Sequence, residues 1–230
     1  MVTREEILKN RRFLGVRKCD AFSKIIAEID QMEDFPGNIA EDIINNPQLL
    51  PVFLDKIYSG SNKVKFDSAT ILRVISRKSP ETLYPHIDFF IGLLDNKNKL
   101  NMWNTIEIIA NLSAVDSQDR INDILDRFYD IVFNDSMAAA VHVIDNSWKI
   151  VKFKPELQEK IIDKLIEIEK ISGNKKRQNI LLGYVILFFD KSFPEIRDKS
   201  KIISFVKRQL NNPRKATRIK SKRFLRKHSN

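Results

Sequence analysis

The feature that most constrains this chain is a pair of amphipathic helices that cannot be stable on its own. In residues 79–114, Ser79-Pro80 starts an expected helix with its apolar residues on one side, and polar residues 95–99 interrupt it. The apolar residues after the break again follow helical spacing. Neither helix can bury its apolar side alone, so this hairpin predicts similar hairpins before and after it.

Prolines mark where those hairpins begin. Helical patterns start at Asn46-Pro47, Ser79-Pro80, Lys154-Pro155 and Phe193-Pro194. Proline is tolerated there because the amides of a first turn have no partner within the helix. The intervals between these prolines are 33, 75 and 39 residues. The long interval predicts one further start near residue 117, where residues 116–119 (DSQD) offer an N-cap and an acidic first turn. Five hairpins are therefore expected from Pro47 to the end.

This pattern resembles the HEAT/armadillo-like helical-repeat family. The sequence TLYPHIDFFIGLL is similar to the family's first helix, in which a proline is followed by an apolar run that ends in a Leu pair. In the first repeat, Asp67 and Arg73 stand six residues apart, as in many HEAT repeats. The family's ladder of small and apolar residues is matched there by Val64, Ala69, Ile71, Leu72 and Ile75.

The resemblance implies an all-α fold, a right-handed α-α superhelix of about five hairpins in which residues 47–230 form one continuous domain. Equivalent buried positions of successive second helices are then expected at Leu72, Ile109, Ile144 and Leu182.

Residues 1–46 do not follow the repeat. Thr3 is expected to cap a short charged helix, and a second helix is expected over about residues 17–32. Phe35-Pro36-Gly37 is expected to end that helix, with a short helical turn over residues 39–44. Because terminal repeats need one polar face, we expect this segment to form an N-terminal helical cap.

The composition favours a soluble, all-α protein. The chain has 230 residues, of which 43% are hydrophobic, with only six glycines and no alternation typical of strands. Its single cysteine, Cys19, excludes an internal disulfide and a thiolate zinc cluster, as expected in a reducing compartment. The longest apolar run, residues 180–189, is too short to cross a bilayer, and no signal-peptide layout is present. We therefore expect a cytoplasmic location.

No residue pattern typical of an enzyme is present. The sequence has no glycine-rich phosphate loop, nucleophile elbow or HExxH motif, so we expect a noncatalytic protein without a cofactor or metal. His142 shares a helix face with Asp145, Asn146 and Lys149. This group is interpreted either as a polar binding site or as an ordinary solvated face. One His and one Asp are too few ligands for a metal.

The family resemblance implies that the second helices line the concave surface of the superhelix. The polar residues predicted to line this surface and bind a partner are Arg77, Asn104, Glu107, Asn111, His142, Asp145, Asn146, Lys149, Lys176 and Asn179. Their charges are mixed, whereas a groove that follows a phosphate backbone should be uniformly basic. The mixture favours a protein or peptide partner. Trp103 and Trp148 are expected in the core rather than on a stacking platform.

The excess of positive over negative charge is confined to the C-terminal hairpin. Residues 201–230 contain 11 lysines and arginines and no acidic residue, whereas the preceding 200 residues are nearly neutral. A final helix is expected to open at Pro213, and on it a stripe predicted to bind anions recurs every fourth residue: Arg214, Arg218, Lys222 and Arg226. The stripe is interpreted either as a solvated basic end that opposes aggregation or as a site for a nucleic acid or other polyanion.

Three functions from different classes are consistent with these features. The first is a noncatalytic helical-repeat scaffold that binds a protein or peptide on its concave face. The alternative is a nucleic-acid-binding protein that uses the basic C-terminal helix. A third resemblance, to the HEAT-like alkylpurine DNA glycosylases, rests on Asp145 and Trp148 alone, because the expected arginine and the basic groove are missing.

Overall fold

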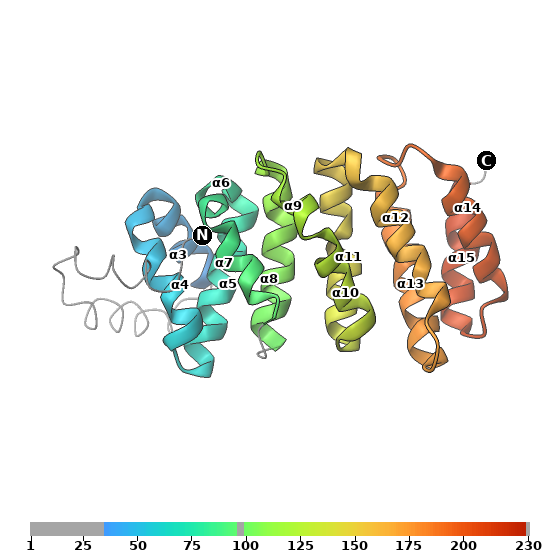
Figure 1. The fold of residues 1–230 in the computed structure, drawn as a ribbon, viewed down its shortest axis with the longest axis horizontal. Helices are drawn as coiled ribbons and strands as arrows, with labels where there is room; N and C mark the ends of the chain where they lie inside the picture. The colour runs from blue at the N-terminus through green and yellow to red at the C-terminus, as the bar shows by residue number, and fades with distance from the viewer. Residues whose placement is uncertain (1–34, 96–98, 229–230) are drawn as a thin grey trace. The chain divides into compact units, whose positions relative to one another are not determined.

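A computed structural model describes residues 35–95 and 99–228 of the chain (Figure 1). These residues form helices joined by short connections and contain no strand, so the prediction of an all-α fold is confirmed. The predicted capping helices near Thr3 and over residues 17–32, and Cys19, lie outside the described residues.

The chain divides into two compact units between Ile108 and Ile109, within helix α8 (Lys99–Leu112). Besides the larger part of α8, the described part of unit 1 contains α3 (Phe35–Asn45), η2 (Pro47–Leu49), α4 (Leu50–Ser59), α5 (Asn62–Lys78), α6 (Pro80–Leu83), η3 (Tyr84–His86) and α7 (Ile87–Leu93). In unit 2 follow η4 (Ser113–Val115), α9 (Arg120–Asp123), α10 (Leu125–Asn134), α11 (Met137–Phe153), η5 (Pro155–Leu157), α12 (Gln158–Ile166), η6 (Glu167–Lys170), α13 (Lys175–Ser192), α14 (Lys199–Arg208), η7 (Gln209–Asn211) and α15 (Lys215–His228).

Most of the predicted hairpin starts are present. Pro47, Pro80 and Pro155 each lie in the first turn of a helix. The start expected near residue 117 is formed by Asp116, whose carboxylate accepts hydrogen bonds from the backbone amides of Arg120 and Ile121 at 2.9 and 3.1 Å. These two amides belong to the first turn of α9, where no helical carbonyl is available to them.

The prediction that Pro194 opens a helix is wrong. Helix α13 continues to Ser192, and Pro194 lies in the turn that follows it. Proline is also common just after a helix end, so its presence alone does not distinguish the two positions. Helix α14 begins at Lys199 instead, with the carboxylate of Asp198 accepting a hydrogen bond from the amide of Ser200 at 3.0 Å.

The start of the last helix also differs from the prediction. Helix α15 begins at Lys215 rather than at Pro213, because the side chain of Asn212 accepts a hydrogen bond from the amide of Arg214 at 2.9 Å and starts the helix there.

Two helix boundaries in unit 1 differ as well. The sequence predicts that Phe35-Pro36-Gly37 ends a helix, but α3 begins at Phe35, because a proline in the first turn loses no hydrogen bond. The helix predicted to start at Pro80 is interrupted by the 3-10 turn Tyr84–His86, which separates α6 from α7. Pro85 causes this break, since it has no amide to donate and its ring disturbs the preceding turn.

The core follows the predicted apolar positions. Leu72, Ile109 and Ile144 are completely buried and Leu182 is 4% exposed, so all four expected second-helix positions are confirmed as buried.

Within unit 2 the second helices of three pairs lie side by side. Helix α11 contacts α13, and α13 contacts α15, while α10, α12 and α14 pack against this layer (Figure 1). Gly183 allows the close approach of α13 and α15, because a Cβ there would lie 2.9 Å from the Thr217 hydroxyl oxygen. The same hydroxyl donates a hydrogen bond to the Asn179 carbonyl at 2.8 Å.

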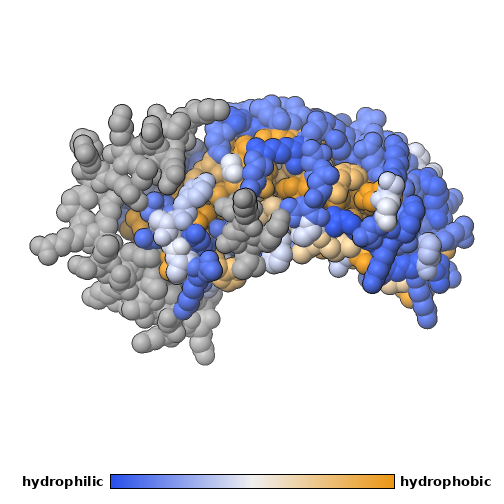
Figure 2. All heavy atoms as spheres, turned by 60° about the horizontal axis from the view of Figure 1, so that its bottom comes forward, coloured by the Kyte–Doolittle hydropathy of each residue, from blue (hydrophilic) through white to orange (hydrophobic). Residues whose placement is uncertain are grey.

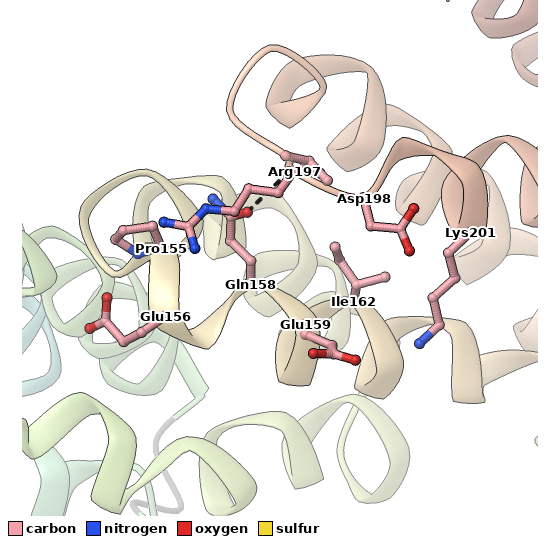
Figure 3. A pocket seen from close by; sticks show the side chains of 9 residues that line it. Pro155, Glu156, Gln158, Glu159, Ile162, Arg197, Asp198 and Lys201 are labelled. Carbon is pink, nitrogen blue, oxygen red and sulfur yellow. Dashed lines mark hydrogen bonds between the residues drawn. The ribbon is translucent and has the colours of Figure 1, made fainter.

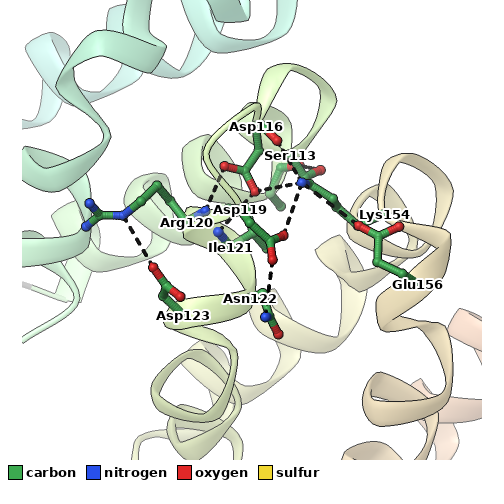
Figure 4. Close-up of polar contacts among 10 residues, drawn as sticks. Ser113, Asp116, Asp119, Arg120, Ile121, Asn122, Asp123, Lys154 and Glu156 are labelled. Carbon is green, nitrogen blue, oxygen red and sulfur yellow. Dashed lines mark hydrogen bonds and ion pairs between the residues drawn. The ribbon is translucent and has the colours of Figure 1, made fainter.

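An ion pair links the end of α11 to the start of α9 (Figure 4). The Lys154 ammonium lies 2.7 Å from the Asp116 carbonyl oxygen and 3.1 Å from its carboxylate, which has no exposed surface. Asp119 lies 3.4 Å from the same ammonium. Burial lowers the pKa of Lys154, but the two carboxylates outweigh it, so the net pKa lies above its usual value.

Candidate binding sites

In unit 1, two of the predicted partner-binding residues neutralise each other. The Glu107 carboxylate is held by Arg77, whose Nε lies at 2.7 Å, and by Arg73, whose Nη1 lies at 3.4 Å. Only 12% of the Glu107 side chain is exposed. Asn104, in the same unit, is buried at 8% exposure, as is Asn111 in unit 2. The two asparagines are therefore largely interior residues.

On α11 the predicted polar group is only partly at the surface. Asp145 is exposed, and His142 and Lys149 are half-buried. Asn146 is buried, and its side-chain amide donates to the His142 carbonyl oxygen at 2.9 Å. Within residues 35–95 and 99–228, no three or more His, Cys, Asp or Glu side chains gather in a way that could hold a metal ion.

On α13, Lys176 is exposed but Asn179 has a structural role. The Asn179 side-chain oxygen accepts a hydrogen bond from the Asn212 amide at 3.0 Å. Together with the Thr217 hydrogen bond to its carbonyl, this contact fixes the start of α15 against α13.

The exposed side of α11, α13 and α15 also carries aromatic and aliphatic side chains that the sequence interpretation missed. Trp148, expected in the core, is half-buried, and the Lys191 ammonium lies 4.0 Å from the centre of its ring. Tyr184 is half-buried below Lys220, at 4.7 Å. Leu187 is 42% exposed. We call this group, together with Asp145, the second-helix face of unit 2.

Helical spacing contains the signal for this face. Tyr184, Leu187 and Lys191 follow one another at spacings of three and four residues along α13 and so share one side of the helix. Trp103, also expected in the core, is half-buried in unit 1. A sequence pattern separates the buried side of a helix from its exposed side, but a large ring at the border of the two is assigned to the core too easily.

Burial and the nearby charge of Arg214 lower the pKa of Lys220. The lysine side chain reaches its place by crossing Gly183, where the absence of a side chain leaves room for it. Lys220 therefore lies with its ammonium over a ring and its aliphatic chain against α13, which makes it part of the second-helix face.

The residues of the predicted anion-binding stripe do not all lie on one side of α15. Positions four residues apart are rotated by about 40° on an α-helix, so the stripe drifts from one side to another. Arg214 and Arg218 are half-buried, and the Arg218 guanidinium donates to the carbonyl oxygens of Asn212 and Pro213 at 2.8 and 2.9 Å. Lys222 and Arg226 are exposed.

Some C-terminal cations pair with acids of the preceding helices. Arg208 binds Glu169 at 2.8 Å, and Lys201 pairs with Asp163. Asp190 pairs with Lys227 at 2.9 Å and with His228 at 2.7 Å. Burial raises the pKa of Asp190, but the hydrogen bonds and charges of Lys227 and His228 lower it by more, so the net pKa lies below its usual value. Within the part of the chain that the structure describes, no acidic partner is found for Lys207, Lys215, Lys222, Arg223 or Arg226.

A pocket of about 290 Å³ lies between the start of α12 and the turn before α14 (Figure 3). Gln158 closes one side of it, since its amide donates to the Glu195 carbonyl oxygen at 2.9 Å and its oxygen accepts from the Arg197 amide at 3.4 Å. The other polar lining residues carry charges of both signs: Glu156, Glu159, Arg197, Asp198 and Lys201. This mixture of charges favours no ligand of a single charge.

Comparison with protein-family models, curated proteins and solved structures found no match to this chain. Among the helices of the described ranges, none has the length and apolar character needed to cross a membrane.

Proposed function

We propose that this chain is a noncatalytic helical-repeat protein of the HEAT-like type, which binds a peptide segment of a protein partner on the second-helix face of unit 2. The layer of α11, α13 and α15 supports this proposal, because adjacent second helices offer a continuous surface to an extended ligand. We also propose that the helix pairs continue as the right-handed superhelix that the family resemblance implies.

The observation that carries the proposal is the exposure of Leu187 on the side of α13 that also presents Tyr184 and Lys191, the lysine that lies over the Trp148 ring. An aliphatic side chain left 42% exposed gains from contact with apolar groups of a polypeptide. It gains little from a phosphate backbone. Asp145 lies three residues before Trp148 on α11 and places a carboxylate on the same surface, which interrupts the continuous positive charge that a phosphate backbone requires.

The charges of this face indicate the kind of peptide. Lys191 and Lys220 hold their ammonium groups over Trp148 and Tyr184. A carboxylate of the ligand can reach each ammonium group from the solvent side without disturbing the ring contact. The face therefore fits a peptide with an apolar side chain that packs on Leu187 and acidic residues on either side of it.

Selection of random peptides on the full-length protein tests this proposal. Peptides that are enriched should combine an apolar residue with acidic neighbours. A Leu187→Asp variant should bind them at least tenfold more weakly, because the substitution places a charge where the apolar side chain packs. Ile219→Asp is the matched control, since Ile219 is an exposed aliphatic residue of α15 at 56% exposure outside this face.

The control variant should bind the same peptides within twofold of the wild type. If Leu187→Asp and Ile219→Asp bind them equally well, or if no peptide is enriched, the second-helix face does not bind peptides and the proposal is wrong.

A further inference from the structure

One exposed side of helix α15 carries positive charges that form no ion pair within the described part of the chain. The helix carries seven lysines and arginines and no acidic residue. Of these, Lys227 pairs with Asp190, Lys220 lies over Tyr184, and Arg218 is bound to backbone carbonyl groups. The remaining four cations are Lys215, Lys222, Arg223 and Arg226, and all four are exposed.

The buried residues of α15 fix which way these cations point. Thr217, Ser221 and Phe224 are buried at 0–1% exposure and define the inner side of the helix. Lys215, Lys222 and Arg226 lie on the opposite side, at spacings of seven and four residues. They extend over about 16 Å, given a rise of about 1.5 Å per residue. Hydrophilic residues cover this C-terminal end of the molecule, at the right of Figure 2. We call Lys215, Lys222, Arg223 and Arg226 the α15 cationic face.

Like charges this close destabilise a helix by about 0.2–0.5 kcal/mol for each pair. The described part of unit 2 contains acidic residues that neutralise other cations of this hairpin, as Asp163 and Glu169 do for Lys201 and Arg208. It provides none for the α15 cationic face. An external anion would remove the repulsion that the fold leaves in place.

We propose that the α15 cationic face binds the phosphate backbone of double-stranded nucleic acid without reading its sequence. A duplex strand presents one phosphate for about every 3.4 Å of its axis, which is a linear array of anions suited to a linear array of cations. Arg223 and Arg226 can each hold phosphate oxygens through two parallel N–H groups.

The same surface excludes other partners by its chemistry. A helix that lies on a membrane needs a broad apolar side, and among the described residues of α15 Ile219 is the only large apolar side chain that is exposed. Single-stranded nucleic acid is held largely by stacking on aromatic rings. The one aromatic residue of this stretch besides His228, Phe224, is 1% exposed and packs against Phe193 instead.

Binding of a fluorescent random-sequence DNA duplex of 20 base pairs to the full chain tests this inference by anisotropy. Four phosphate contacts predict a salt slope of about −3.6, so affinity should fall about 150-fold between about 50 and 200 mM salt. The double variant Lys222→Gln, Arg226→Gln should reduce the slope by about 2 and lose most of the affinity at low salt. Its helix content and unfolding temperature should not fall, since both side chains are exposed.

The matched control is Lys152→Gln, Lys176→Gln, which removes the same charge from exposed positions on α11 and α13. This control should keep the wild-type salt slope. Leu187→Asp should also keep it, which separates this inference from the proposed peptide site. Equal losses in the two double variants would show a diffuse charge effect and overturn the proposal. So would the absence of binding at 50 mM salt, or tighter binding to phosphatidylserine vesicles or to polyglutamate than to the duplex.

Discussion

Replacing Lys154 with methionine is the most informative test of how unit 2 is held together. The Lys154 side chain is 12% exposed, and its ammonium group contacts both the carbonyl and the carboxylate of Asp116, whose side chain has no exposed surface. Methionine keeps the aliphatic part of the side chain and removes only the charge and the donors. The substitution leaves the Asp116 carboxylate buried without its cation.

The expected loss follows from what remains around that carboxylate. Removing one partner of a buried ion pair costs about 3–5 kcal/mol when the other charge is left uncompensated. Here two backbone amides, those of Arg120 and Ile121, still donate to Asp116. Since each hydrogen bond to a charged group contributes about 1.5–3 kcal/mol, the carboxylate is partly satisfied. We expect the free energy of unfolding of unit 2 to fall by about 2–4 kcal/mol.

Urea unfolding of the full chain at 25 °C measures this loss. The chain has two tryptophans, Trp103 in unit 1 and Trp148 in unit 2, so a Trp103→Phe background makes the fluorescence report on unit 2. The control is Lys164→Met, which removes an ion pair of 2.8 Å with Asp126, a carboxylate that is 64% exposed. Exposed pairs contribute less than about 1 kcal/mol. A loss for Lys154→Met no larger than that for Lys164→Met would refute the structural role of the buried pair.

Three further predictions concern the core, a helix contact and pH. Truncating Ile109 to alanine should lower the free energy of unfolding by about 2–5 kcal/mol, measured by urea unfolding, since the side chain is completely buried. Gly183→Ala should cost about 1–3 kcal/mol in the same assay, because its Cβ would lie 2.9 Å from the Thr217 hydroxyl oxygen. The pKa of Asp190 is lower in the folded chain than in the unfolded chain, where it is about 4. Its ion pairs therefore stabilise the fold fully above about pH 4, and this stabilisation is lost as the pH falls through the folded pKa. As the pH is lowered below about 4, the free energy of unfolding should therefore fall more steeply for the wild type than for Asp190→Asn.

The prolines show what the sequence could predict about the fold and why it failed in places. Pro47, Pro80 and Pro155 start helices because each follows a break in the apolar pattern. Pro194 follows such a break too, but the turn that contains it belongs to the end of α13. Only the later cap at Asp198 determines where α14 begins. Helix existence therefore follows from periodicity, whereas a boundary depends on which of several capping groups makes its hydrogen bond.

The candidate sites were less predictable for a related reason. The sequence places Asn146 with Asp145 on one side of α11, yet Asn146 is buried and Asp145 exposed, because adjacent positions are rotated by about 100° and the border of the face lies between them. The partners of Glu107 and Asp190 come from other helices. Spacing along one helix contains no information about such contacts.

The proposed peptide site is tested most directly by NMR of the full chain with methyl-labelled leucine and isoleucine and nitrogen-15-labelled tryptophan, titrated with a selected peptide. We expect the methyl signals of Leu187 and the indole signal of Trp148 to shift in proportion to the bound fraction. The methyl signal of Ile219 should stay in place, because it lies outside the second-helix face of unit 2. Saturable binding that moves the Ile219 signal and leaves those of Leu187 and Trp148 unchanged would contradict the proposed function.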